Sequence, residues 1–235
     1  MLSLWRDAAS GVGVVRLTEA EEIEEMVRLF EDVAGEQGWQ PAGALRQWVD
    51  RSIYFALQVQ GDEGPGGPGE PGQFAGGLQL VLADAGGLLP CHALWPEVPA
   101  GAKEGSKGRS AHVAMLAVDT AYRGQGILFW HLAVEMWRHC VGAGVTTLWI
   151  EVTPRVLPLY RRLGWPLTIR GQVRRHWGED CYLCTLGIPD VAQALLQRAE
   201  GSPYYRQIVA QAFRVTLAAR GDWPTMGAET ERCAA

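Results

Sequence analysis

A glycine-containing turn between an apolar strand and an apolar helix constrains the fold of this chain more than any other sequence feature. The turn lies in residues 118–127, whose sequence is VDTAYRGQGI. Residues 111–118 before it are mostly apolar, and residues 127–141 after it are apolar on nearly every helical face. Glycine has no Cβ, so it lets the backbone turn sharply and leaves room for a ligand. The pattern predicts a strand, a tight turn and a helix buried against a sheet.

The start of this helix is a predicted anion site. The first N–H groups of a helix have no partner within the helix, and the helix dipole adds positive charge at the same end. Such a site suits a phosphate or pyrophosphate group, and Arg123 adds a cation. The expected ligand contacts are Arg123, Gly124, Gln125, Gly126, Ile127 and Leu128. The alternative is an ordinary turn between a strand and a helix.

Hydrophobic periodicity predicts an α/β protein of alternating strands and helices. The expected strands are residues 11–17, 52–58, 74–83, 111–118, 146–152, 167–169 and 181–186. The expected helices are 18–33, opened by a capping box at Thr18 and Glu21, 41–50, opened by Pro41, 127–141, 155–163 and a stretch from 189 to 219. Residues 61–72 and 99–110 are expected to be mobile loops because they are rich in glycine with proline or lysine.

Composition excludes several functional classes. The chain has 235 residues, is 48% hydrophobic and carries a net charge of −5, which argues against a nucleic-acid or membrane-surface binder. No apolar run approaches the ~20 residues of a transmembrane helix, and the N-terminus lacks a signal-peptide pattern, so we expect a cytoplasmic protein. Five scattered cysteines favour reduced thiols. Cys181 and Cys184 have metal-ligand spacing but lie in a predicted strand facing opposite sides, so no metal is expected.

A second segment, Leu159-Tyr-Arg-Arg-Leu-Gly-Trp165, accompanies the glycine turn. Together the two segments resemble motifs A and B of the GNAT acyltransferase superfamily. The resemblance implies a mixed central sheet with helices on both faces over residues 1–188. The helical pattern after Pro189 predicts a C-terminal helical extension and tail over 189–235. The resemblance further implies that the turn holds the pyrophosphate of acetyl-CoA or a longer acyl-CoA, and that Leu116 and Val118 also bind this donor. The implied activity is N-acyl transfer to the amine of a small molecule or peptide.

A more distant resemblance is to acyl-homoserine-lactone synthases and N-acyl amino acid synthases. It rests on residues 76–82, 87–90, 94–99 and 161–167. These families take acyl groups mainly from acyl carrier protein, which is therefore an alternative donor and partner. Three of their residues differ here, because an arginine is replaced by Gln79, and a glutamate and an arginine by His112 and Met115. These differences argue against lactone synthesis from S-adenosylmethionine.

Acyl transfer from a thioester to an amine needs a proton for the leaving thiolate and a base for the amine. The resemblance places Tyr160 near the thioester sulfur, as general acid, although a core tyrosine is a serious alternative. Pro158 removes a backbone donor and is expected to bend the first turn of the helix that carries it. His112 is the first candidate base, because an ordinary histidine pKa of ~6.5 suits the task. Glu151 is the second candidate base. Both also fit structural roles.

Two further questions concern the donor. The family has a small residue where this chain has Leu128, and a bulky side chain there could crowd a pyrophosphate. The phosphopantetheine arm of a carrier protein has one phosphate and no adenosine, so it would avoid that problem. A basic loop at Arg170, Arg174, Arg175 and His176 could meet an acidic carrier protein or the 3′-phosphate of coenzyme A, or be solvated. A catalytically idle module that binds acyl thioesters is the non-enzymatic alternative, and a homodimer is left open.

Overall fold

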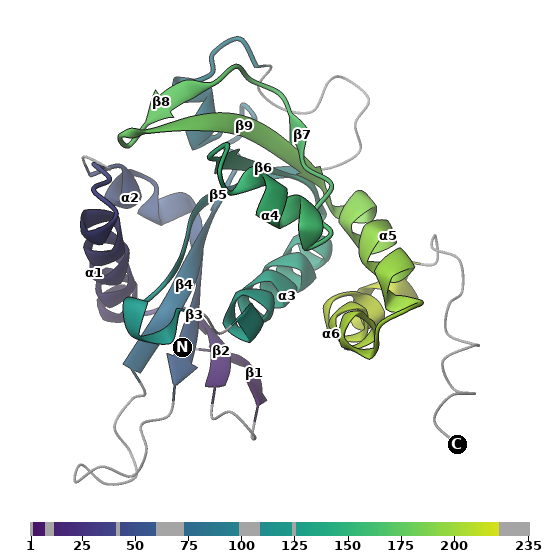
Figure 1. Cartoon of the computed structure of the whole chain (residues 1–235). Helices are drawn as coiled ribbons and strands as arrows, with labels where there is room; N and C mark the ends of the chain where they lie inside the picture. The colour runs from purple at the N-terminus through teal and green to yellow at the C-terminus, as the bar shows by residue number, and fades with distance from the viewer. Residues whose placement is uncertain are drawn as a thin grey trace, which may run out of the picture.

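A mixed β-sheet forms the centre of the computed structural model, which describes residues 2–7, 12–40, 43–59, 73–98, 109–123 and 126–220. The strands run in the order β1-β2-β3-β4-β5-β6-β9-β7, with β8 paired to β9 (Figure 1). In these ranges β5 and β6 are parallel and the other pairs are antiparallel. The strands are β1 (Leu2–Asp7), β2 (Val12–Leu17), β3 (Ser52–Val59), β4 (Gln73–Leu82), β5 (Arg109–Val118), β6 (Val145–Val152), β7 (Thr168–Ile169), β8 (Arg174–His176) and β9 (Glu179–Gly187).

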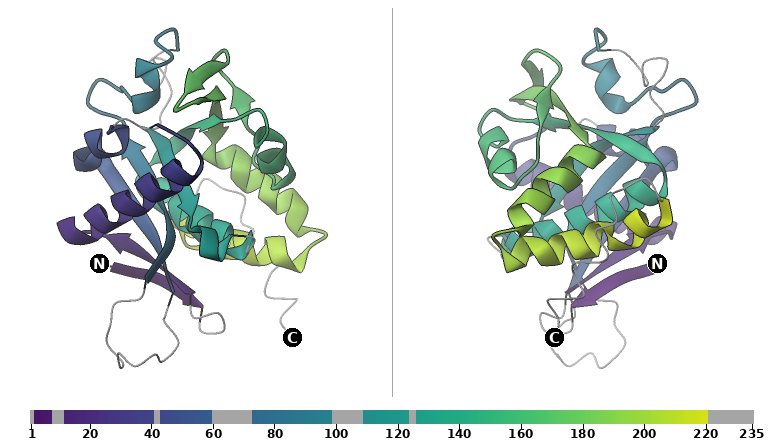
Figure 2. Two further views of the ribbon diagram at one scale, coloured as in Figure 1. Left: turned by 60° about the vertical axis from the view of Figure 1, so that its left-hand side comes forward. Right: turned by 90° about the vertical axis from the view of Figure 1, so that its right-hand side faces the viewer.

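Helices cover both faces of this sheet, which confirms the predicted layers (Figures 1 and 2). One face carries α1 (Ala20–Glu36), α2 (Ala44–Gln47) and the 3-10 turn η1 (Val49–Arg51). The other carries α3 (Gly126–Gly142), α5 (Ile188–Ala199) and α6 (Pro203–Arg220). The short helix α4 (Leu157–Arg162) follows β6, and 3-10 turns η2 (Pro90–Ala93) and η3 (Thr120–Tyr122) flank β5 in the sequence. None of the described helices has the length and apolarity needed to cross a bilayer.

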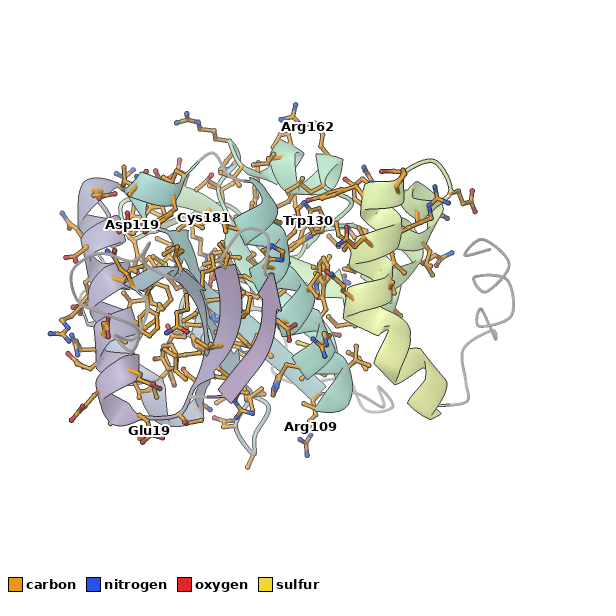
Figure 3. All side chains as sticks on the ribbon, turned by 90° about the horizontal axis from the view of Figure 1, so that it is seen from below. Glu19, Arg109, Asp119, Trp130, Arg162 and Cys181 are labelled. Carbon is orange, nitrogen blue, oxygen red and sulfur yellow. The ribbon has the colours of Figure 1, made fainter. Side chains whose placement is uncertain are left out.

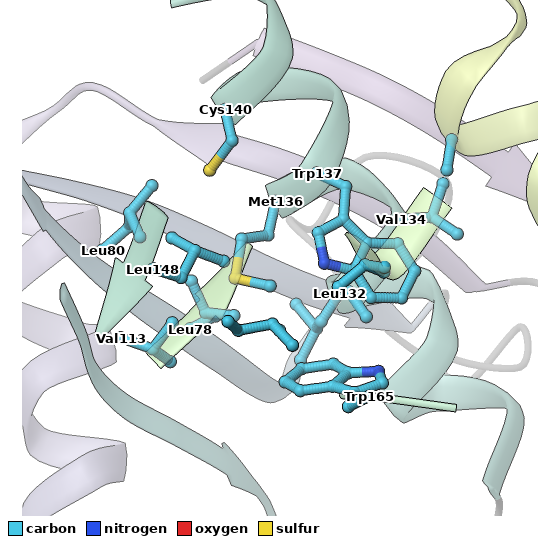
Figure 4. Packing of buried hydrophobic residues seen from close by; sticks show 14 of the residues in the cluster. Leu78, Leu80, Val113, Leu132, Val134, Met136, Trp137, Cys140, Leu148 and Trp165 are labelled. Atoms are coloured by element: carbon cyan, nitrogen blue, oxygen red, sulfur yellow. The ribbon is translucent and has the colours of Figure 1, made fainter. Parts of the chain in front are cut away.

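The hydrophobic interior is divided by the sheet. The larger core lies on the α3 face (Figure 4). There the sheet covers one side of α3, and α5 and α6 cover the other, which explains why α3 is apolar on most of its faces. A smaller core lies under α1, around Met26 and Phe30. A third cluster, here called the Trp95 cluster, comprises Leu89, Cys91, Trp95, Val98, Trp149, Cys181 and Leu183. Cys181 belongs to this cluster and Cys184 to the larger core, so the two thiols do face opposite sides of β9.

The C-terminal helices are part of the same packed unit as the sheet. Val191 and Leu195 of α5 and Ile208 and Ala212 of α6 are buried in the larger core. Figure 3 shows Trp130 of α3 on the side that faces these helices, and its ring contacts those of Tyr204 and Tyr205 on α6. Residues 188–212 therefore stabilise α3 directly.

Most predicted elements are present, and the differences have local causes. Glu19, and not Thr18, is the N-cap of α1, and the expected capping box at Thr18 and Glu21 was wrong. The second helix is only four residues long and begins after Gly43, whose backbone is left-handed. β5 begins at Arg109, two residues inside the predicted loop. β1 and β8 were not predicted at all.

The helix α4 corrects the expectation for Pro158. The helix begins at Leu157, two residues later than predicted, so Pro158 lies in its first turn. A first-turn residue has no intrahelical N–H bond to lose, so the proline suits the start of this helix. The expectations for Gly11, Pro41, residues 61–72 and 99–108, and the tail after 220 lie outside the described residues.

Gly164 provides a stability prediction. Its φ is +92°, and a Cβ there would lie 3.2 Å from Cδ2 of Leu195 and 2.8 Å from Nε of Arg198. Gly164→Ala should lower the free energy of unfolding by roughly 1–3 kcal/mol, mainly through backbone strain. Urea denaturation measures this. The control is Gly35→Ala, where a Cβ meets nothing within 4 Å, and the helix should gain slightly. Equal stability of the two variants would contradict the prediction.

Candidate active site

The parallel strands β5 and β6 separate halfway along their length. Their pairing ends at Val113 and Ile150, although β5 continues to Val118 and β6 to Val152. A bulge in β5 lies at the same point, because Gln79 and Leu80 of β4 pair with Met115 and Val113 and leave Ala114 unpaired. Within the described residues no strand pairs with β5 on the β6 side beyond Val113. The sheet therefore contains an open internal edge.

Leu116 and Val118, two of the predicted donor-binding residues, present their main chain to this open edge. Main-chain groups of successive strand residues alternate between the two edges. The N–H of Asp119 bonds the carbonyl of Ala75 beside β4, so Val118 points the other way. There its carbonyl accepts a hydrogen bond from Nε of Arg123 at 3.0 Å. Leu116, two residues earlier, shares this orientation.

Arg123 is already engaged within the protein. Besides its bond to Val118, its guanidinium contacts the Glu36 carboxylate at 2.8 Å. The Thr120 hydroxyl donates to the same carboxylate at 2.5 Å. The bond from Thr120, followed by that from Arg123, lowers the pKa of Glu36. Arg123 thus joins the turn to the end of α1, and it must share or release Glu36 to bind a phosphate.

The rest of the predicted anion site is described only in part. Gly124 and Gln125 lie outside the described residues, and α3 begins at Gly126. Leu128 is 1% exposed and lies in the larger core. Its side chain is therefore packed against α3 neighbours and the sheet, which leaves its main chain for contact with a ligand. The predicted donor contacts of residues 123–128 stay a prediction.

His112 and Glu151 form a buried pair on the opposite face of the sheet from α3. Nε2 of His112 lies 2.5 Å from Oε2 of Glu151, and the side chains are 3% and 10% exposed. The pair lies beside the point of strand separation, since His112 pairs with Trp149 in the β5–β6 ladder. The other ring nitrogen of His112, Nδ1, is buried and has no hydrogen-bond partner among the described residues.

This contact fixes the chemistry of the imidazole. Burial raises the pKa of Glu151, but the neighbouring His112 outweighs it, and the resulting pKa lies below the ordinary value. An ionised carboxylate accepts hydrogen bonds only, so Nε2 of His112 carries the proton. Nδ1 of a neutral His112 then holds the lone pair and can accept a proton from an amine. The sequence named both residues as bases, and the geometry favours His112 as base and Glu151 as its orienting partner.

Tyr160 lies on α4, which continues the chain beyond the end of β6. Its ring stacks on Trp165 with centroids 5.0 Å apart and contacts Phe129 at 6.0 Å. Burial raises its pKa to about 12. Within the described part of the chain its hydroxyl has no hydrogen bond. Tyr160 packs on the larger core and not with the His112–Glu151 pair, so the two parts of the predicted site lie on different layers around the end of β6.

Some neighbours of the pair were not predicted as site residues. His176, on β8, was assigned to a basic loop, and Trp95 to a distant sequence resemblance. In the structure His176 contacts Trp95, whose cluster includes Trp149 beside His112. Of the basic loop, Arg174 is bound to Glu97 and the Leu94 carbonyl, and Arg170 donates a hydrogen bond to the Thr185 hydroxyl at 2.9 Å. Arg175 is exposed. Only the tertiary fold could have revealed the contact between His176 and Trp95, because these two residues lie far apart in the sequence.

The chain has the GNAT acyltransferase fold, with a split between two parallel strands, a long helix that begins at Gly126 after β5, and a short helix after β6. Solved structures with this fold are similar to it. N-acyl amino acid synthase FeeM from uncultured soil microbes is 18% identical, with a TM-score of 0.65 over 80% of this chain and 96% of that one. The CoA-dependent acyl-homoserine lactone synthase BjaI, with S-adenosylmethionine and isopentyl-CoA, is 15% identical, with a TM-score of 0.57 over 82% and 92%.

A plant protein shows the same fold with less similarity. NAA60 of Arabidopsis thaliana, in complex with acetyl-CoA, is 14% identical, with a TM-score of 0.52 over 76% of this chain and 99% of that one. No family model matches the sequence, and no curated protein matches it. The expected relationship to GNAT proteins and lactone synthases is therefore confirmed at the level of the fold.

Proposed function

We propose that this protein is an N-acyltransferase that moves an acyl group from a thioester to the amine of a small molecule or peptide. The observation that carries the proposal is the buried His112–Glu151 pair beside the separated strands, with Nδ1 of His112 unpaired. The unpaired nitrogen of His112 can accept the proton of an attacking amine, and the open edge of β5 can bind an extended thioester donor. FeeM and BjaI, named as acyl-transferring synthases, support this class of reaction.

The donor would bind along the open edge of β5. The phosphopantetheine arm of an acyl-CoA or acyl carrier protein is extended and contains amide groups. It can hydrogen-bond the main chain of Leu116 and Val118 as a strand would. Its phosphate would lie at the first turn of α3, where helix N–H groups and the dipole favour negative charge.

The reaction then uses three side chains. The amine nitrogen attacks the thioester carbon, the C–N bond forms, and its proton passes to Nδ1 of His112. Glu151 stabilises the imidazolium that results. The C–S bond breaks, and the thiolate receives its proton from the Tyr160 hydroxyl, which bulk solvent restores. The raised pKa of Tyr160 keeps this hydroxyl protonated in the resting state.

A donor and acceptor panel tests the proposal. The protein is mixed with acyl-CoA or with acyl carrier protein, over a range of chain lengths, and with amino acids, amines or peptides. Release of the free thiol is followed with a trapping reagent, and the product is identified by its mass. Thiol release that depends on the amine supports transfer. Tight donor binding without amine-dependent release from any donor would instead indicate a binding module.

The start of α3 provides a prediction about donor affinity. Gly126→Val should place a branched side chain beside the first helix N–H groups and weaken donor binding at least about tenfold, because each lost phosphate contact costs roughly 1.5–3 kcal/mol. Calorimetry measures this. The control is Gly142→Ala at the other end of α3, where a Cβ meets nothing within 4 Å. A folded Gly126→Val protein with unchanged donor affinity would remove the anion site from the proposal.

A further inference from the structure

A second buried histidine near the His112–Glu151 pair has an unpaired ring nitrogen. His92 belongs to the 3-10 turn η2 and is 8% exposed. Its Nδ1 accepts a hydrogen bond from the main-chain N–H of Leu89 at 2.9 Å. A ring nitrogen that accepts a hydrogen bond carries no proton, so the imidazole is neutral and its proton is on Nε2. Nε2 is buried, and no hydrogen-bond partner for it exists among the residues that the structure describes.

His92 and His112 border the same tryptophan. The His92 ring contacts the ring of Trp149, with centroids 5.8 Å apart and planes at 62°. Trp149 is the ladder partner of His112, on a strand about 5 Å away, so these two side chains lie on the same face of the sheet. Glu151, two residues further along β6, shares that face. The turn η2 also packs against β5 and β6. Two buried nitrogens without described partners, Nε2 of His92 and Nδ1 of His112, therefore lie around Trp149.

The two nitrogens have opposite hydrogen-bonding character. Nδ1 of His112 holds a lone pair, because its Nε2 donates to Glu151, whereas Nε2 of His92 carries a proton. A buried polar group without a partner is unfavourable, so both nitrogens favour a ligand that satisfies them. The amine of the acyl acceptor supplies an N–H at His112. An oxygen close to that amine would supply the hydrogen-bond acceptor that His92 lacks.

The charges around this site favour the oxygen of a neutral carbonyl over that of a carboxylate. Glu151 is ionised, since its pKa lies below the ordinary value, and it would repel a second negative charge in the same buried region. His92 offers a neutral donor and no positive charge. Arg174 reaches the adjoining Trp95 cluster, but its guanidinium already binds Glu97 and the carbonyl of Leu94. The oxygen that suits His92 is therefore that of a neutral carbonyl, as in an amide or a peptide bond.

We propose that His92 is a specificity-determining residue of the acyl-acceptor site, and that its Nε2–H binds the oxygen of an amide carbonyl next to the reacting amine. The acyl acceptor that fits is the N-terminus of a peptide or an amino acid amide, in preference to a free amino acid. This inference rests on the proposed function, which places the amine at His112. The competing occupant is a buried water that bridges the two histidines.

Three matched series of acyl acceptors test this in the wild-type protein: amino acid amides, the corresponding free amino acids and the corresponding decarboxylated amines. Rates are expressed per concentration of unprotonated amine, because the three series differ in the pKa of the amine. Only the amides offer a neutral carbonyl, so their kcat/KM should exceed that of both other series by roughly tenfold, as expected for one buried hydrogen bond. Equal kcat/KM for amides and decarboxylated amines would mean that His92 binds water or no ligand, and would overturn the proposal.

The substitution His92→Asn removes the donor and keeps the turn. Asparagine Oδ1 lies close to the position of Nδ1 and can accept from Leu89, but the side chain ends short of Nε2. KM for the amides should rise roughly tenfold with kcat nearly unchanged, and the preference over decarboxylated amines should be lost. His92→Gln, whose longer side chain carries an N–H to the position of Nε2, should restore part of the preference. The control is His139→Asn on α3, which should keep it. Nε2 of His139 is also buried without a described partner, but that ring contacts Phe55 on the other face of the sheet.

A His92→Asn protein that folds and keeps the wild-type preference would overturn the proposal and leave His92 a residue that only caps η2. If neither variant folds, the comparison of amides with decarboxylated amines in the wild type still decides. If the wild type acylates no amine, the proposed function fails. Calorimetry of an amide and its decarboxylated amine with the donor-free protein then decides the inference, because His92 should still favour the amide. Equal or undetectable binding of the two compounds would contradict it.

Discussion

Replacing His112 with glutamine is expected to lower kcat by about 10²–10⁴-fold, the usual contribution of a positioned general base. Glutamine can still donate a hydrogen bond to Glu151, so the buried carboxylate keeps a partner, but it offers no basic nitrogen where Nδ1 lies. The loss should appear in kcat and kcat/KM together, because the interaction exists only in the transition state. Donor affinity, measured by calorimetry, should change little.

The pH dependence distinguishes this role from a structural one. Glu151 has a lowered pKa, so the stability that it contributes is present above its unfolded pKa and is lost as the pH falls through the lower folded value. Protonation of Glu151 in that range also removes the acceptor that orients His112, so activity should be lost together with this stability. The acid limb of the rate profile should disappear in His112→Gln. His139→Gln, on α3 against Phe55, is the matched control and should retain the wild-type profile. Wild-type turnover in His112→Gln would exclude His112 as the base.

Tyr160→Phe should lower turnover by about 10²–10⁴-fold while the protein remains stable. Phenylalanine keeps the stacking on Trp165 and the contact with Phe129, so the melting temperature should fall little. The missing hydroxyl leaves the thiolate without its proton donor, and the effect should be largest with donors whose thiol is a poor leaving group. Donor affinity should remain close to that of the wild type.

The control for Tyr160 is Tyr205→Phe on α6, a tyrosine of the same aromatic cluster that contacts Trp130. Because the pKa of Tyr160 is raised to about 12, its hydroxyl should stay protonated, and no basic limb below about pH 11 should belong to it. If Tyr160→Phe turns over at the wild-type rate between pH 6 and 9, Tyr160 is only a packing residue. The proton must then come from water.

Local sequence patterns predicted the layers and most elements because their periodicity reports burial directly. The apolar run that became α3 is an example, since both sides of that helix are covered. The patterns failed where local backbone geometry or tertiary contacts decide the extent of an element. The second helix begins only after Gly43, and β8 forms only because β9 lies beside it. The predicted start of the helix that carries Pro158 was wrong by two residues, because the position of a helix start is poorly determined by sequence.

The candidate site was predictable as a set of residues but not as an arrangement. His112 and Glu151 were named separately, and their contact depends on the parallel register of two strands that no local pattern specifies. The engagement of Arg123 by Glu36 joins residues 87 positions apart. For Leu128, sequence alone could not show that the side chain faces the core. These facts follow from the fold, so the roles of these residues stay predictions.

The separation of β5 and β6 also means that a bound donor would complete the sheet and stabilise the folded protein. A bound pantetheine arm would occupy the place of a missing strand and hydrogen-bond main-chain groups of β5 beyond Val113, where the described residues supply no pairing strand. Such a ligand binds the native state and not the unfolded chain, so its binding raises the free energy of unfolding by mass action. At a donor concentration one hundred times its Kd the gain is about 2.7 kcal/mol. Thermal melting with a series of acyl thioesters would therefore rank donors before any acceptor is known.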